Sequence, residues 1–261
     1  SHFPSADWFD YSTIKQQAKT IHDAGLTVCC GTAGDMDFIN SISRAKGMEE
    51  VLMDLILDNE VFLEIMDARF KFYYEMHERM LDAAGGLIDF THIGEDLGNQ
   101  EGQMISFDIF DKHFAPKLGK YFSMAHNKGA RTMKHMCGTV HAFLPRLINL
   151  GLDVYDVVQP TTPENNIDSL AKNYGDKIVF QGSLDVQQEL AFGTTADVEK
   201  EVQKRLNLFP KGGLILGPSH AVQAGSPVEN TLAMYRTAGS LMKEIPSWVY
   251  DIEGEIDTKI N

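Results

Sequence analysis

The chain has 261 residues, 43% hydrophobic and 23% charged, the balance of a globular protein with apolar material for one substantial core. Its formal net charge is −14. A field of that sign repels phosphate backbones and anionic lipid, so we expect neither a nucleic-acid nor a membrane partner. Three cysteines are too few for a disulfide framework, and no run of about 18 apolar residues is present, so we expect a cytoplasmic protein without a membrane span.

Short apolar runs alternate with helical patterns along the chain. In chain order we predict a helix over 11–24, a strand over 26–30, a loop or broken helix over 31–46, a helical region over 48–84 that breaks near 58–59, a strand over 87–93, a helix over 107–128, a strand over 130–136, a helix over 140–150, a strand over 152–158, a helix over 167–174, a strand over 177–180, a helix over 196–209, a strand over 213–216 and a closing helix over 228–245.

This alternation is typical of parallel βα units. No Gly-x-Gly-x-x-Gly follows a predicted strand, so a dinucleotide-binding sheet has no support. The pattern favours an α/β fold, a (β/α)8 TIM barrel that occupies residues 1–261 as a single domain. Six strands are predicted where a full barrel has about eight. Either two strands escape detection, or the barrel lacks an N-terminal portion.

Polar residues follow the predicted strands, and a barrel gathers the carboxyl ends of its strands at one mouth. We therefore predict catalytic roles for some of these residues and substrate binding for others. The predicted catalytic residues are Glu95, Asp96 and His220, and the predicted substrate-binding residues are Gln159, Gln181, Asp185 and Ser219. The acidic pair also fits a solvated turn, and Asp185 fits a cap of the turn after its strand.

His135 and Cys137 stand two residues apart at the end of the strand over 130–136, so both project to one side, about 6–7 Å apart. An imidazole and a thiol in this arrangement form a plausible half of a zinc site. His220 is the natural third ligand, with Glu95 or Asp96 as the alternate. The competing interpretations are a buried cysteine beside a core histidine, and a loop histidine at 220.

Several segments resemble one superfamily. Gln181-Gly-Ser-Leu-Asp185 resembles the Gln-Gly-Asn-Leu-Asp segment of uroporphyrinogen decarboxylase. Residues 216–220, Leu-Gly-Pro-Ser-His, followed by Pro-Val-Glu-Asn at 227–230, resemble its late histidine loop and helix start. Residues 151–154 match its Gly-x-Asp strand start. The resemblance runs from about residue 87 to 245 and implies the barrel fold of that superfamily.

The His-x-Cys at 135–137 is similar to the zinc-dependent methyltransferase branch of this superfamily. Those enzymes move methyl groups to or from a corrinoid on a partner protein, and they have a cysteine as their later zinc ligand. This chain has no cysteine after Cys137, and His220 stands nearest to that role. The Arg-rich N-terminal signature of the decarboxylases, and the aspartate that grips pyrrole nitrogens, are not found here.

The resemblance thus implies a zinc-dependent methyltransferase. It would move a methyl group between a small substrate (a methoxylated compound, methylamine, methanol or a thiol) and the cobalamin of a corrinoid protein. The expected cofactors are zinc and the partner's corrinoid, and the resemblance leaves room for a homodimer. Two alternatives stay open, which are uroporphyrinogen decarboxylation in porphyrin metabolism and non-catalytic binding of a tetrapyrrole or corrinoid.

Overall fold

Six strands form the centre of the molecule. The computed structural model describes residues 3–162 and 164–239. Each of the six predicted strands is present, with ends that differ by a few residues from the prediction. The strands are β1 (Cys29–Gly31), β2 (Phe90–Gly94), β3 (Arg131–His135), β4 (Val154–Val158), β5 (Val179–Leu184) and β6 (Leu214–Pro218).

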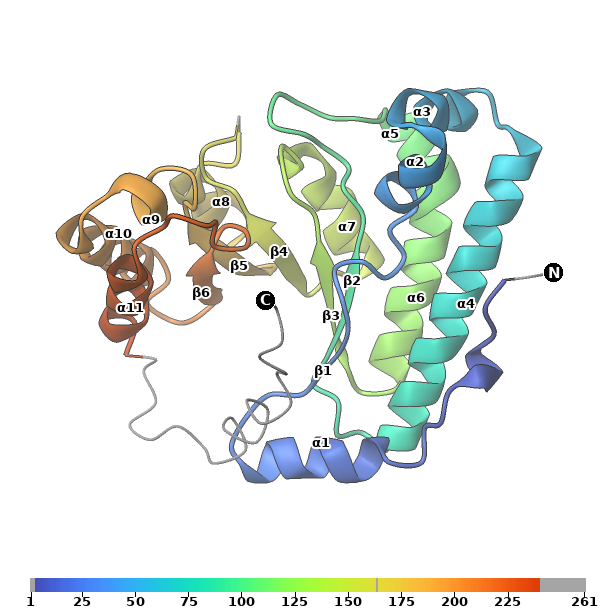
Figure 1. Cartoon of the computed structure of the whole chain (residues 1–261), viewed down its shortest axis with the longest axis horizontal. Coiled ribbons are helices and arrows are strands. Elements are labelled where there is room, and N and C mark those ends of the chain that lie inside the picture. Colours follow the sequence, from blue (N-terminus) through green and yellow to red (C-terminus); the bar gives the residue numbers. More distant parts are fainter. Residues whose placement is uncertain (1–2, 163, 240–261) are drawn as a thin grey trace, which may run out of the picture.

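All six strands lie in one parallel sheet whose spatial order, β1-β2-β3-β4-β5-β6, is also their order in the chain. Parallel neighbours require crossover connections, and helices supply most of them (Figure 1). This is the α/β, TIM-barrel-like arrangement that the sequence predicts. Within the described residues β1 and β6 do not pair with each other, so the sheet carries six of the about eight strands of a closed barrel.

Helices fill the intervals between the strands. They are α1 (Ile14–Asp23), α2 (Ile39–Lys46), α3 (Met48–Ile56), α4 (Glu60–Ala84), α5 (Phe107–Ile109), a π-helical turn (Phe110–Phe114), α6 (Ala115–Asn127), α7 (Leu144–Leu150), α8 (Ile167–Tyr174), α9 (Glu189–Phe192), α10 (Thr195–Leu208) and α11 (Val228–Thr237), with short 3-10 turns at Ala6–Trp8 and His141–Phe143. Most match the predicted ranges, whereas α9 was not predicted. Of the closing helix predicted over 228–245, residues 240–245 lie outside the described residues.

The break predicted near residues 58–59 is present and has a local cause. Asp58 adopts a left-handed backbone conformation with φ +53°, which a continuous helix cannot contain. The side chain of Asn59 then accepts a hydrogen bond from the N–H of Phe62 and caps the start of α4. The long helical pattern is therefore divided into α3 and α4.

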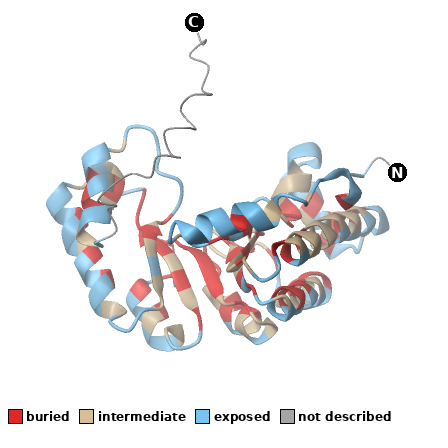
Figure 2. Cartoon of the chain, turned by 90° about the horizontal axis from the view of Figure 1, so that it is seen from below, coloured by how far each residue is buried: buried red, intermediate tan, exposed pale blue. Residues whose placement is uncertain are grey.

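Buried residues concentrate on the strands and on the helix faces that cover them, as Figure 2 shows. In-register neighbours on β4 and β5, Tyr155 and Phe180, are fully buried with ring centroids 6.3 Å apart. By contrast, α1 buries only Ala18. No helix among residues 3–162 and 164–239 has both the length and the apolar character needed to cross a bilayer.

The sheet register aligns the residues that matter for the site. Gly94 on β2 pairs with His135 on β3, and His135 pairs with Asp156 on β4. Paired residues on neighbouring strands point to the same face of a sheet. The register therefore brings the side chains of His135 and Asp156 together near the carboxyl ends of their strands.

Candidate metal centre

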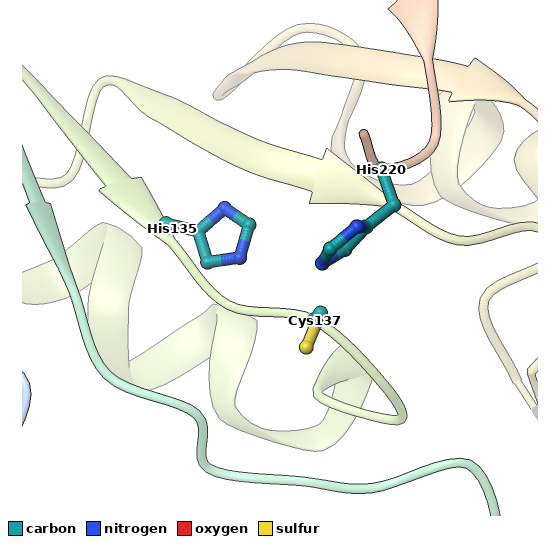
Figure 3. Close-up of side chains that lie close together, drawn as sticks. All are labelled: His135, Cys137 and His220. Carbon is teal, nitrogen blue, oxygen red and sulfur yellow. The ribbon is translucent and has the colours of Figure 1, made fainter. Parts of the chain in front are cut away.

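Three potential metal ligands converge at the carboxyl ends of β3 and β6. His135 is the last residue of β3, Cys137 follows two residues later, and His220 follows β6. A ring nitrogen of each histidine and the Cys137 sulfur all lie within 4.8 Å of one another. Figure 3 shows one nitrogen of the His135 ring facing the other two residues. His135 and Cys137 are half-buried and His220 is exposed, so the group opens to solvent on the His220 side.

The other ring nitrogen of His135 contacts a carboxylate. His135 Nδ1 lies 2.9 Å from Oδ2 of Asp156, and His92 Nε2 on β2 lies 2.9 Å from the same oxygen. Burial acts to raise the pKa of Asp156, but the hydrogen bonds with the two histidines outweigh it and bring that pKa to about 2. Asp156 is therefore a carboxylate at neutral pH.

Cys137 is held by the loop after β2. Its backbone N–H donates to Oδ1 of Asp96 at 2.9 Å, and the amide of Asn40 on α2 donates to Oδ2 of Asp96 at 2.7 Å. Burial raises the pKa of the Cys137 thiol to about 12, and the negative charge of Asp96 adds to this effect. A bound zinc ion would replace the thiol proton, because a coordinating thiol is deprotonated.

The chain turns sharply after Cys137 because the next residue is a glycine. Gly138 has φ +77°, and a Cβ at this position would lie 2.6 Å from the carbonyl oxygen of Asn99. The N–H of Gly138 donates to Oε1 of Gln159 at 2.6 Å, and its carbonyl accepts from Asn165 at 2.7 Å. The predicted substrate residue Gln159 thus supports the turn that carries Cys137.

Glu95 is buried against the start of α2. Its carboxylate accepts hydrogen bonds from the backbone N–H groups of Phe38 at 2.9 Å and Ile39 at 3.3 Å, where α2 begins. Complete burial, followed by the nearby charge of Asp37, raises the pKa of Glu95 well above its ordinary value. The structure therefore places this predicted catalytic carboxylate at a helix start, whereas Asp96 is beside Cys137.

The remaining predicted residues lie on β5 and at the ends of β5 and β6. The hydroxyl of Ser219 accepts from the N–H of Val186 at 3.2 Å and joins the two strand ends. Gln181 Oε1 and Asp185 Oδ2 are buried and have no hydrogen-bond partner among the described residues. These two oxygens are acceptors, so any group that reaches them must donate an N–H or O–H.

Two contributors, His92 and Asp156, were missed by the sequence reasoning. Each lies inside a predicted strand, whereas the predicted functional residues follow the strand ends. The sequence does indicate that Asp156 has a partner. It is a charged residue in the middle of a run of apolar residues, and buried charges are rarely unpaired. His92 is likewise a polar residue inside a predicted strand, but histidine is buried more often than aspartate, so the indication is weaker.

The donor set fits zinc. Imidazole nitrogen and thiolate sulfur are the ligands that zinc prefers, and three protein ligands are the number found in catalytic zinc sites. The second nitrogen of His135 contacts a carboxylate, which is one of the partners, with backbone carbonyls and water, that zinc-bound histidines almost always have. His135, Cys137 and His220 are therefore the residues that would hold the ion.

Comparison with known proteins places the chain in a family. The sequence profile of the uroporphyrinogen decarboxylase (URO-D) family matches residues 27–241. No curated protein matches the chain.

Among solved structures, a methyltransferase from Methanosarcina mazei is similar at a TM-score of 0.66 and 16% identity, over 87% of this chain and 63% of that one. The chain thus spans less than two thirds of the length of that structure. The 3-keto-D-glucoside 4-epimerase YcjR from E. coli is similar at a TM-score of 0.55 and 14% identity, over 88% of this chain and 85% of that one. At these identities both structures support the fold alone. With a profile that covers residues 27–241, the chain belongs to the uroporphyrinogen decarboxylase family.

Proposed function

We propose that this protein is a zinc-dependent methyltransferase that moves a methyl group between a small substrate and a corrinoid carried by a partner protein. The observation that carries the proposal is the convergence of potential ligand atoms of His135, Cys137 and His220 within 4.8 Å. The family and the fold shared with a methyltransferase support it. We further propose that the reaction takes place in the cytoplasm.

In this proposal the residues have distinct tasks. When bound, zinc supplies a Lewis acid that lowers the pKa of a thiol or water, or polarises an ether oxygen. Cys137 gives up its proton on metal binding, and Asp96, whose carboxylate holds the Cys137 backbone, is an acceptor for it. Glu95 supports α2 and contributes to the site through that helix.

The substrate class is a methoxylated compound, methylamine, methanol or a thiol. We propose that Gln181 and Asp185 bind it, since each has a buried acceptor oxygen without a partner among the described residues. The N–H groups of methylamine or the O–H of methanol would satisfy these oxygens, and a thiol or methoxylated compound would need a further N–H or O–H group to do so. Gln159 and Ser219 would act beside them by fixing the loops after β3 and β5.

The test uses a matched pair of cysteine variants. Purified protein is incubated with methylcobalamin and each candidate acceptor. Visible absorption spectroscopy of the cobalamin measures the loss of its methyl group. Transfer is expected for the wild type and for Cys29→Ser, whose thiol lies on β1 outside the candidate ligands. Transfer is expected to disappear in Cys137→Ser with unchanged circular dichroism. Equal transfer by both variants would contradict the proposal.

Uroporphyrinogen decarboxylation is the second candidate, favoured by the family match. This reaction requires no metal. Release of CO2 from uroporphyrinogen by both the wild type and Cys137→Ser would therefore support decarboxylation over methyl transfer. A change in cobalamin or porphyrin absorption without turnover of any substrate would instead indicate a binding protein.

A further inference from the structure

Two histidines share one carboxylate oxygen beside the candidate metal centre. Asp156 Oδ2 lies 2.9 Å from Nδ1 of His135 and 2.9 Å from Nε2 of His92. The Asp156 side chain is 9% exposed, while the two histidine side chains are about 20% exposed. The three residues come from β2, β3 and β4, which are neighbours in the sheet. His135 is the one residue that this trio shares with the candidate ligands Cys137 and His220.

The trio could itself be taken for a metal site, because its ligand atoms also lie within 4.8 Å of one another. Its distances favour hydrogen bonds instead. Ligand atoms around a tetrahedral zinc, with bonds of about 2.1 Å, are about 3.4 Å apart. Contacts of 2.9 Å are the normal separation of N–H donors and carboxylate oxygens. The carboxylate oxygen therefore accepts from both rings.

This arrangement determines which nitrogen of His135 carries the proton. A carboxylate oxygen has no proton to donate, so Nδ1 of His135 must donate to it. When the ring is neutral, its lone pair is on Nε2, the nitrogen of His135 that faces Cys137 and His220 in Figure 3. His135 is thereby prepared for coordination before any ion binds.

We propose that Asp156, held in place by His92, is the positioning residue that fixes His135 with its proton on Nδ1 and its Nε2 directed at the metal centre. The inference rests on the proposed zinc site and assigns two residues to it. The role of His92 follows from the shared oxygen: its N–H restrains rotation of the Asp156 carboxylate. It also occupies a lone pair that Asp156 would otherwise offer to an ion.

The structure supplies a matched control at the start of β4. Asp153, directly before that strand, accepts from His126 Nε2 at 2.6 Å and from the N–H of Thr132 at 2.8 Å. Asp153→Asn thus breaks a histidine–aspartate pair that lies outside the candidate centre. It removes the charge of a histidine-bound aspartate that has no contact with His135.

The experiment has two readouts on the full chain. The first is the tautomer of His135 in metal-free protein, read by ¹⁵N NMR of histidine-labelled protein and assigned with His135→Gln. The second is the zinc dissociation constant, measured by chelator competition. We expect the Nδ1–H tautomer in the wild type and in Asp153→Asn. In Asp156→Asn we expect a mixed tautomer and zinc binding about 10–100-fold weaker. His92→Leu should weaken zinc binding, and His92→Gln, which keeps an N–H donor, should restore most of it.

The outcomes separate the two claims. An Nε2–H tautomer in the wild type, or equal zinc affinity in Asp156→Asn and Asp153→Asn, would overturn the positioning role while the zinc site itself stands. Absence of zinc binding in the wild type, together with an Nδ1–H tautomer that depends on Asp156, would contradict the proposed function and support the positioning role.

Discussion

Cys137 is anchored through its backbone to Asp96, whose Oδ1 accepts the Cys137 N–H at 2.9 Å. Asn40 holds the other oxygen of this carboxylate, so α2, the loop after β2 and the end of β3 are joined at one point. On the opposite side of β3, Asp156 contacts the ring of His135. Both candidate ligands on this segment are thus held by carboxylates from neighbouring strands or their loops.

The first prediction concerns this anchor. Asp96→Ala should lower the free energy of unfolding by about 1–3 kcal/mol, because it leaves the N–H of Cys137 and the amide of Asn40 without their acceptor. It should also weaken zinc binding. Asp96→Asn keeps an acceptor oxygen and should recover part of both losses. Urea unfolding and chelator competition provide the measurements, and an Asp96→Ala protein equal to wild type in both would refute the anchoring role.

Glu95 should behave as a structural residue. Glu95→Ala removes the acceptor of the Phe38 and Ile39 N–H groups and should destabilise the protein by about 1–3 kcal/mol. Glu95→Gln keeps one acceptor oxygen, so it should retain zinc affinity and methyl transfer within a few-fold of wild type. A loss of transfer of 100-fold or more in a folded, zinc-loaded Glu95→Gln protein would show that this carboxyl group has a catalytic role.

Zinc binding should survive the replacement of His220 by cysteine, the later zinc ligand of the methyltransferase branch that the sequence resembles. His220→Cys supplies a thiolate where the ring now faces His135 and Cys137, so zinc binding should be kept. His220→Ala leaves two ligands and should weaken zinc binding by at least about tenfold. Chelator competition compares the two variants. If His220→Ala binds zinc as tightly as the wild type does, the third ligand lies elsewhere.

The Asp153–His126 pair should make stability depend on pH. Burial acts to raise the pKa of Asp153, but hydrogen bonds from His126 and Thr132 outweigh it and lower that pKa below its ordinary value. A carboxyl group with a lowered pKa in the folded state stabilises the protein above its unfolded pKa, and this contribution is lost as pH falls through the folded pKa.

Asp153→Asn should therefore reduce the free energy of unfolding by about 1–3 kcal/mol at pH 7. The difference in free energy of unfolding between this variant and the wild type should become smaller below about pH 4, where the carboxyl group of the unfolded chain takes up its proton. Urea unfolding at a series of pH values measures this difference. A constant difference between pH 7 and pH 3 would mean that the charge on Asp153 is not the source of its contribution.

Much of this architecture can be read from the sequence. The alternation of short apolar runs with helical periods predicts all six strands, because buried parallel strands leave a strong compositional signal. His135 and Cys137 stand out because two residues along a strand end place both side chains on one face. The carboxyl ends of barrel strands meet, so His220 could be grouped with them from far along the chain.

The remaining features depend on relations between segments. The pairing of His135 with Asp156 follows from the register of β3 against β4, which periodicity along one strand does not determine. Glu95 and Asp96 lie in a loop, where strand alternation does not apply. Their roles follow from contacts with α2 and with Cys137, which are distant in the sequence. The helix α9 could not be predicted for a different reason. It has four residues, which is too short to show a helical period.

The most direct test of the central claim is the zinc content of protein purified without chelator, compared with that of Cys137→Ser and Cys29→Ser. We expect about one zinc per chain in the wild type and in Cys29→Ser, and a loss of zinc in Cys137→Ser. A wild-type protein that takes up no zinc, even after reconstitution under reducing conditions, would contradict the claim.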